Sequence, residues 1–202
     1  MDVQDNYHKT PLHFASSQSN VEAAKLLVEC GANVQVRDNN GKTPLHLALM
    51  HRYHDMMRLL LDRGADMDVQ DNDHWTPLHF ASSRSNVEAA KLLVECGATV
   101  QVRDNNGKTP LHLASMRGYH DIMRLLLARG ADVDVQDNNH STPLHLASVR
   151  GSLKAVRLLL QHSANIHVQD ENGDTPFQIA SARGHRKMMQ LLSQYVRSDH
   201  EM

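Results

Sequence analysis

The sequence predicts an all-α solenoid built from repeated helix-turn-helix units, and three observations lead to this prediction. The hexapeptide TPLHFA, or a close variant of it, occurs six times at intervals of 33 residues. Each copy is typical of a helix start, because threonine can cap a helix and proline is favoured at its first position. An apolar segment of helical spacing follows each copy, and in four of the six it ends at a glycine. The motif threonines are Thr10, Thr43, Thr76, Thr109, Thr142 and Thr175.

A period of this length indicates units that bury their apolar faces only against their neighbours. In the first unit, the spacing of Leu12 and Ala15 predicts a first helix with one apolar face, and residues 21–28 follow helical spacing in a second helix. Gly31 is expected to end that second helix as its left-handed residue. Gly64, Gly97 and Gly130 repeat this stop.

A turn rich in Asp, Asn and Gly precedes each motif. One position of this turn alternates between glycine and histidine along the chain. If its φ is positive, the histidines there carry some backbone strain. The residues at this position are Gly41, Gly107 and Gly173, and His8, His74 and His140.

The two ends of the array differ. In the sixth unit Val196 stands where earlier units have the helix-ending glycine, so the last helix is expected to run on into the polar RSDHEM tail. At the amino terminus, residues 1–6 offer no polar cap. We therefore expect either that the array is longer than this sequence or that its amino-terminal face is exposed and less stable than the rest.

The 33-residue period together with the T-P-L-H-x-A motif resembles the ankyrin repeat. The resemblance covers nearly all of the chain and implies a single domain over residues 1–202, an ankyrin-repeat solenoid whose helix pairs are joined by β-hairpin-like loops. The implied repeats are about 5–37, 38–70, 71–103, 104–136, 137–169 and 170–202. It further implies that the motif histidine bonds the neighbouring loop and fixes the stack. These histidines are His13, His46, His79, His112 and His145, and Gln178 takes their place in the sixth motif.

Composition limits the environment and the function. A hydrophobic fraction of 41% with only 4% aromatic residues suits thin layers of Leu, Ala and Val, and the net charge of -2 gives no global attraction to nucleic acid. Cys30 and Cys96 lie two units apart, too far for a disulfide, so we expect free thiols. No apolar run is long enough to span a membrane, and the amino terminus lacks a signal sequence. These features predict an intracellular protein, cytoplasmic or nuclear, and a monomer.

Catalytic and cofactor motifs are not found in the sequence. The segment Asn39–Thr43 ends like a phosphate-binding loop, but Val36 stands where that pattern requires glycine. We therefore expect no enzymatic activity, no cofactor, no metal site and no catalytic residue.

The resemblance implies binding of a protein partner on the concave side, at the loop tips and at the ends of the first helices. In each unit we call five positions the recognition face. Three of them lie four, three and one residues before the motif threonine, and the other two lie seven and eight residues after it. Residues 1–66 and 67–132 differ at nine positions, and four of these fall among the ten recognition-face positions of each block. This concentration of sequence differences on the recognition face favours a binding surface that diverged on a fixed scaffold. The alternative is that exposed positions simply change faster than buried ones.

The expected contact residues follow from these positions. In four successive motifs an arginine stands eight residues after the threonine. In two motifs a methionine stands seven residues after the threonine. Trp75 is the only tryptophan, has no obvious neighbour to bury it, and is expected to be an exposed anchor. The predicted partner-binding residues are Lys42, Met50, Asp73, Trp75, Arg84, Lys108, Met116, Arg117, Arg150 and Arg183. The expected partner is an acidic protein segment with apolar residues, and binding of nucleic acid or another polyanion by the arginines is the alternative.

Overall fold

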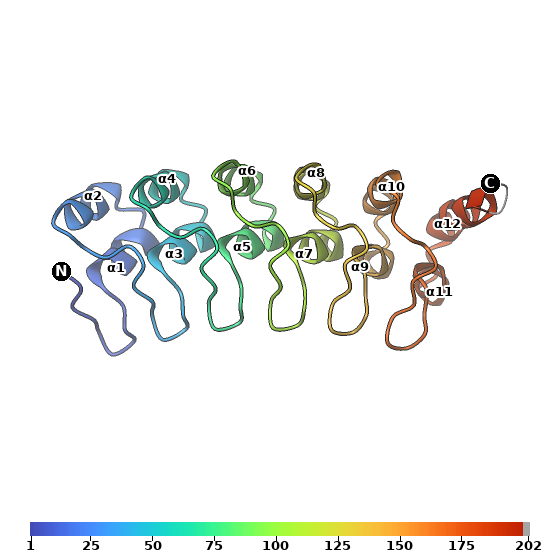
Figure 1. Ribbon diagram of the computed structural model, residues 1–202, viewed down its shortest axis with the longest axis horizontal. Coiled ribbons are helices and arrows are strands. Elements are labelled where there is room, and N and C mark those ends of the chain that lie inside the picture. The colour runs from blue at the N-terminus through green and yellow to red at the C-terminus, as the bar shows by residue number, and fades with distance from the viewer. Residues whose placement is uncertain (200–202) are drawn as a thin grey trace. The chain divides into compact units, whose positions relative to one another are not determined.

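The computed structural model describes residues 1–199, and within them it contains twelve helices and no strand (Figure 1). The helices form six pairs, each with a short first helix that begins at the motif proline and a second helix that follows a tight connection. The first helices are α1 (Pro11–Ser17), α3 (Pro44–Met50), α5 (Pro77–Ser83), α7 (Pro110–Arg117), α9 (Pro143–Arg150) and α11 (Pro176–Ala182). The second helices are α2 (Val21–Glu29), α4 (His54–Asp62), α6 (Val87–Glu95), α8 (His120–Ala128), α10 (Leu153–Gln161) and α12 (Arg186–Asp199). The predicted all-α fold of helix-turn-helix units is confirmed.

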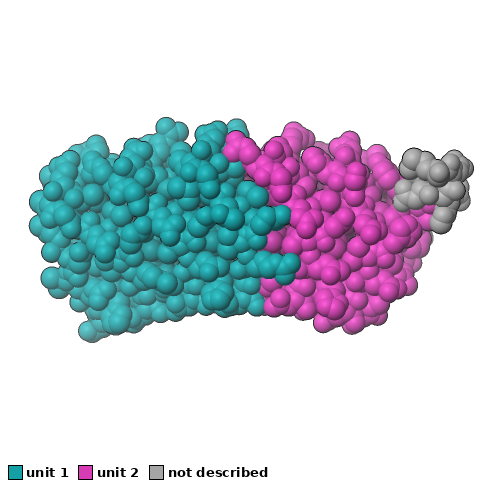
Figure 2. Space-filling model, in the orientation of Figure 1, with its two compact units in different colours: residues 1–105 teal, residues 106–202 magenta. Residues whose placement is uncertain are grey.

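The chain divides into two compact units, shown in different colours in Figure 2. Unit 1 comprises Met1–Asn105 and holds α1 to α6, and unit 2 begins at Asn106 and holds α7 to α12. Within each unit, first helices pack on the first helices of adjacent pairs, and second helices pack on second helices. Each unit therefore has two helical layers with a thin apolar core between them.

The motif explains both layers. Its third residue, a leucine in the first five copies, is fully buried at Leu12, Leu45, Leu78, Leu111 and Leu144. At every motif the threonine and the residue three positions later form a capping box. In the second motif, the backbone N–H and the hydroxyl of Thr43 lie 3.1 and 3.0 Å from Nδ1 of His46. This box orients the histidine ring while it starts the helix.

The connections confirm the turn predictions. His8, His74 and His140 have φ of 59°, 59° and 56°, in the left-handed region that favours glycine. Gly31 has φ of 87° directly after the end of α2, and Ser163 adopts φ of 62° where earlier pairs have glycine. The predicted extension of the last helix is also confirmed, because α12 continues through Val196 to Asp199. The rest of the predicted polar tail, residues 200–202, lies outside the described residues.

Cys30 and Cys96 are free, as predicted, and both are exposed. Among the helices of residues 1–199, none combines the length and the apolar character that a membrane span requires.

Candidate partner-binding face

The recognition-face positions of each unit lie at helix ends and loop tips. Met50 ends α3 and is half-buried, while Met116 and Arg117 are the last two residues of α7 and Arg150 ends α9. Arg84 and Arg183 cap the ends of α5 and α11. All four arginines are exposed, and so is Asp73, whereas Lys42 and Lys108 are half-buried.

Trp75 differs from the expectation of an exposed side chain without neighbours, and that expectation is wrong. The indole is half-buried, and its Nε1–H donates a hydrogen bond to Oδ2 of Asp104 over 3.2 Å. Its ring meets the Phe80 ring edge-on, with centroids 5.0 Å apart, and lies 6.2 Å from the ring of His79. Because Trp75 contacts the next loop and the adjacent helix, it contributes to stability as well as to the surface.

The partner of Trp75 belongs to a recurring arrangement. In the second and fourth loops the equivalent residue is lysine, and it forms an ion pair with the aspartate that opens the following loop. The Nζ–Oδ2 distance is 3.3 Å for Lys42–Asp71 and 3.0 Å for Lys108–Asp137. These aspartates are buried, and each also accepts two backbone N–H groups of its own turn. Trp75 therefore replaces an ion pair with a hydrogen bond from a neutral donor to a carboxylate, and it adds an aromatic contact.

Phe80 lies at the centre of this part of unit 1, although the sequence analysis did not select it. It is only 5% exposed, yet the Arg84 guanidinium lies 5.3 Å and the Lys42 ammonium 5.9 Å from its ring centroid. A cation over an aromatic face is attracted by the ring quadrupole. The available sequence signal was the i, i+4 spacing of Phe80 and Arg84, which puts both on one face of α5.

The four arginines carry charge that the protein does not neutralise. No acidic side chain among residues 1–199 forms an ion pair with Arg84, Arg117, Arg150 or Arg183. The exposed carboxylate of Asp73 forms no ion pair with Arg84 either. In unit 2, Val149 is 38% exposed directly before Arg150, so an apolar contact adjoins a free guanidinium there.

The motif histidines join successive pairs, as the resemblance implied. Nε2 of His46 lies 3.2 Å from the carbonyl oxygen of Trp75, and equivalent contacts link His13 to Lys42, His112 to Ser141 and His145 to Asp174. A carbonyl can only accept, so Nε2 carries the hydrogen and the ring is neutral, with Nδ1 accepting from the threonine. Burial lowers the pKa of His46 to about 4, and it also lowers the pKa of His13 and His145.

No group of three or more His, Cys, Asp or Glu side chains suited to a metal ion occurs within the described part of the chain. Four of the motif histidines, His13, His46, His112 and His145, instead bond a carbonyl of the following loop.

Comparison with known families agrees with the motif. The family model described as Ankyrin repeats (3 copies) matches three successive segments, residues 1–71, 63–137 and 129–201. These segments cover almost the whole chain, so the protein belongs to the ankyrin repeat family. Repeats of this family are generally protein–protein interaction modules and typically not enzymes. A search of curated proteins found no match.

Proposed function

We propose that this protein is a non-catalytic recognition module that binds an acidic, partly apolar segment of a protein partner on its recognition face. The four exposed arginines without an acidic partner are the observation that carries this proposal. A folded protein gains little from unpaired surface charge, whereas arginine beside apolar groups is typical of interface hot spots.

The surroundings of Arg84 support the partly apolar character of the partner. Its guanidinium lies over the ring of Phe80, and the half-buried indole of Trp75 contacts the same ring, so a planar donor group and aromatic side chains belong to one cluster. A carboxylate that approaches Arg84 can accept two parallel N–H groups, and a neighbouring aliphatic or aromatic side chain can pack on Trp75. The partner-binding residues proposed are those predicted from the sequence, with Phe80 added as the support of Arg84.

Affinity capture with charge-reversal variants tests this function. The immobilised parent chain is compared with Arg84→Glu/Arg117→Glu and with the matched control Arg124→Glu/Arg157→Glu, which reverses two exposed arginines on the second helices α8 and α10. The partner should be retained by the parent and the control and lost from the recognition-face variant. Equal retention by all three chains would rule out this face.

Binding to the purified partner is then measured with Trp75 as the fluorescent reporter, because it is the only tryptophan. Arg117→Glu should slow association and weaken its salt dependence, since charges at an interface rim act mainly on the association rate. Circular dichroism of each variant confirms that its fold is intact.

Binding of nucleic acid or another polyanion is the second candidate, and the same unpaired arginines favour it. A titration with a random DNA duplex distinguishes the two functions. Phosphate binding would lose affinity steeply with rising salt, because counterions are released on association. Absence of binding at low salt would exclude this candidate.

The repeat organisation is part of the proposal. We assign one ankyrin repeat to each of the six helix pairs, within a single domain over residues 1–202. Cooperative unfolding of units 1 and 2, followed separately by hydrogen exchange, would support one domain, and two independent transitions would argue for two.

A further inference from the structure

The groove between the second helices α8 and α10 of unit 2 carries an excess of positive charge. It has a volume of about 380 Å³, and the polar residues that line it are His120, Asp121 and Arg124 of α8 and Lys154, Arg157 and Gln161 of α10. Arg124, Lys154 and Arg157 are exposed, and none of them forms an ion pair with an acidic side chain of residues 1–199. Asp121 is the only acidic residue among the described residues of this lining. Three cations therefore share the groove with a single carboxylate.

The equivalent grooves of unit 1 have the opposite balance of charge. In both of them acidic residues outnumber lysines and arginines. The charged residues are Glu22, Lys25, Asp55, Arg58 and Asp62 between α2 and α4, and Asp55, Arg58 and Glu88 between α4 and α6. The cations of these second helices therefore share their grooves with enough carboxylates to balance them, and those of the α8–α10 groove do not.

Two positions of the second helix account for this difference. The second residue of the helix is acidic in α2, α4, α6 and α8, but it is lysine in α10 and α12, at Lys154 and Lys187. The ninth residue is acidic in α2, α4 and α6 but uncharged in the last three second helices, as at Gln161. Because the helices occupy equivalent places in their pairs, the packing of a pair does not require this change of charge.

His120 reports the electrostatic field in the groove. Its Nε2 lies 3.2 Å from Oγ of Ser152 at the start of α10. Burial lowers the pKa of His120, and the charges of Lys154 and Arg124 lower it further, while Asp121 acts against them. Cations from both helices therefore act on the same ring, which indicates that they face a common space.

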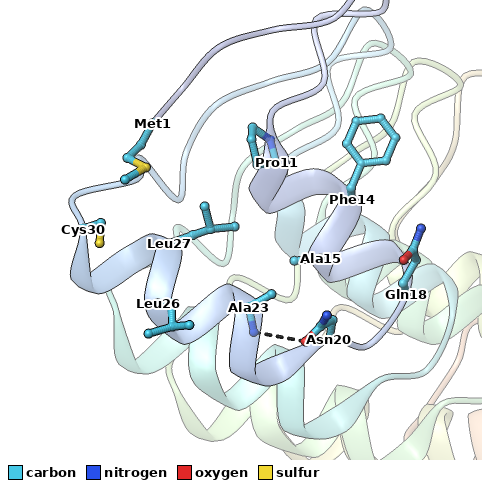
Figure 3. Close-up of a pocket in the computed structure, with 10 residues that line it drawn as sticks. All are labelled: Met1, Pro11, Phe14, Ala15, Gln18, Asn20, Ala23, Leu26, Leu27 and Cys30. Carbon is cyan, nitrogen blue, oxygen red and sulfur yellow. Dashed lines mark hydrogen bonds between the residues drawn. The ribbon is translucent and has the colours of Figure 1, made fainter.

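The pocket beside α1 and α2 in unit 1 shows that such a charge is not a general property of the pockets of this protein (Figure 3). None of the 10 described residues that line it has a charged side chain, and Phe14, Leu26 and Leu27 make much of it apolar. The α8–α10 groove therefore suits an anionic ligand, and the pocket of unit 1 does not.

We infer that the α8–α10 groove is a binding site for the phosphate group of a phosphomonoester. Three cations and one carboxylate leave two positive charges without a counterion in the described lining. A phosphomonoester carries a charge of about −1.5 to −2 at pH 7, so it matches this excess, whereas a phosphodiester carries only a single negative charge. The site goes beyond the proposed recognition function, because its residues lie outside the recognition-face positions.

The side chains of the groove provide suitable donors. The guanidinium groups of Arg124 and Arg157 can each donate two parallel N–H groups to phosphate oxygens, and the Lys154 ammonium adds a compact charge. The carboxamide of Gln161 is a further donor. Half-buried Leu158 also lines the groove and offers an apolar contact to the organic part of the ligand.

Titration of the full chain with glycerol 3-phosphate, followed by NMR, tests the site. Binding should shift the signals of His120, Arg124 and Arg157, and it should raise the pKa of His120, because the anion offsets the charges of Lys154 and Arg124. Absence of any shift at about 10 mM glycerol 3-phosphate would overturn the inference.

The decisive variant is Lys154→Glu, which introduces the residue that α2 and α6 carry at this place and should therefore keep the fold. It should weaken binding by about tenfold or more, since hydrogen bonds between charged groups are the strong ones. The matched control Lys187→Glu makes the same change of charge at the equivalent position of α12, which does not line the groove, and should bind like the parent. Equal weakening by both variants would show an effect of net charge alone and would overturn the site.

Two further ligands define the chemistry and the source of the phosphate. Dimethyl phosphate, a phosphodiester, should bind at least about tenfold more weakly, and equal affinity would mean an adventitious ion only. Cosedimentation with phosphatidylcholine vesicles that contain phosphatidic acid would assign the phosphate to a lipid headgroup if it depends on Lys154. Binding of glycerol 3-phosphate without cosedimentation would assign it to a soluble ligand, and both results support the site.

One double variant separates this site from the recognition face. Arg124→Glu/Arg157→Glu should retain the protein partner but lose glycerol 3-phosphate, and Arg84→Glu/Arg117→Glu should do the reverse. Loss of glycerol 3-phosphate from the recognition-face variant alone would overturn the α8–α10 site. Because the two ligands are measured separately, either proposal can fail while the other holds.

Discussion

Replacing His46 with glutamine tests the buried neutral ring of the motif histidine, because glutamine does not titrate and the sixth motif already carries it at this place. There, Oε1 of Gln178 lies 2.8 and 3.0 Å from the backbone nitrogen and the hydroxyl of Thr175, which are the same two cap bonds that His46 accepts at Nδ1. His46→Gln should therefore keep the helix cap. It exchanges the imidazole Nε2–H that donates to the Trp75 carbonyl for the N–H of a more flexible carboxamide, and it removes the edge contact between the His46 and Phe80 rings.

The expected cost at neutral pH follows from the weakened buried bond and the lost ring contact. Removing a partner of a buried hydrogen bond altogether costs about 1 to 3 kcal/mol, so a glutamine amide that donates to the Trp75 carbonyl keeps the cost below the upper end of that range. At lower pH the parent has its own penalty, because folding lowers the pKa of His46 from 6.5 to about 4. Between these values the unfolded chain binds the proton and the folded chain does not, so stability falls as pH falls through this window.

The magnitude can be worked from that pKa. One unit is worth 1.36 kcal/mol, so the parent loses about 2 kcal/mol at His46 between pH 7.5 and pH 5, and about 3 kcal/mol below pH 4. Glutamine does not titrate. The difference in unfolding free energy between parent and His46→Gln should therefore shrink by about 2 kcal/mol at pH 5.

Urea unfolding followed by circular dichroism at pH 7.5 and pH 5 measures this difference, and NMR titration of the His46 ring gives its pKa directly. The other motif histidines are common to both chains and cancel in the comparison. A difference that is the same at both pH values, or a His46 pKa near 6.5 in the folded protein, would refute the buried neutral ring.

Three further predictions concern single positions, each measured as the free energy of unfolding. His74→Gly should stabilise the protein by about 0.5 to 1 kcal/mol, because φ of 59° is strained for histidine, and destabilisation would show that the ring makes a needed contact. Ser163→Gly should give a similar gain, since Ser163 holds φ of 62° at the end of α10; no gain would mean that the serine side chain compensates there. Trp75→Phe keeps an aromatic ring but removes the Nε1–H donor to Asp104, so it should cost about 1 kcal/mol, whereas a neutral effect would show that water replaces this bond.

The sequence determined the fold class, the places of the helix starts and the turns with positive φ. This was possible because each of these features depends on residues close together in the chain: threonine and proline before the first helix, glycine after the second, and histidine or glycine in the turn. The resemblance to the ankyrin repeat, which the recurring motif carries, implied in addition that the motif histidines link successive pairs.

The tertiary structure decided the environment of the recognition face. Trp75 meets Asp104 across 29 residues, and Lys42 meets Asp71 across the same separation, so neither partner is visible in the local pattern. Phe80 became the support of Arg84 and Lys42 for the same reason, because Lys42 reaches it from the preceding loop. The period fixes which positions face each other in a stack of units. The size and charge of the side chains at those positions decide which of them bond. Trp75, for example, occupies the place that lysine holds in the loops before and after it.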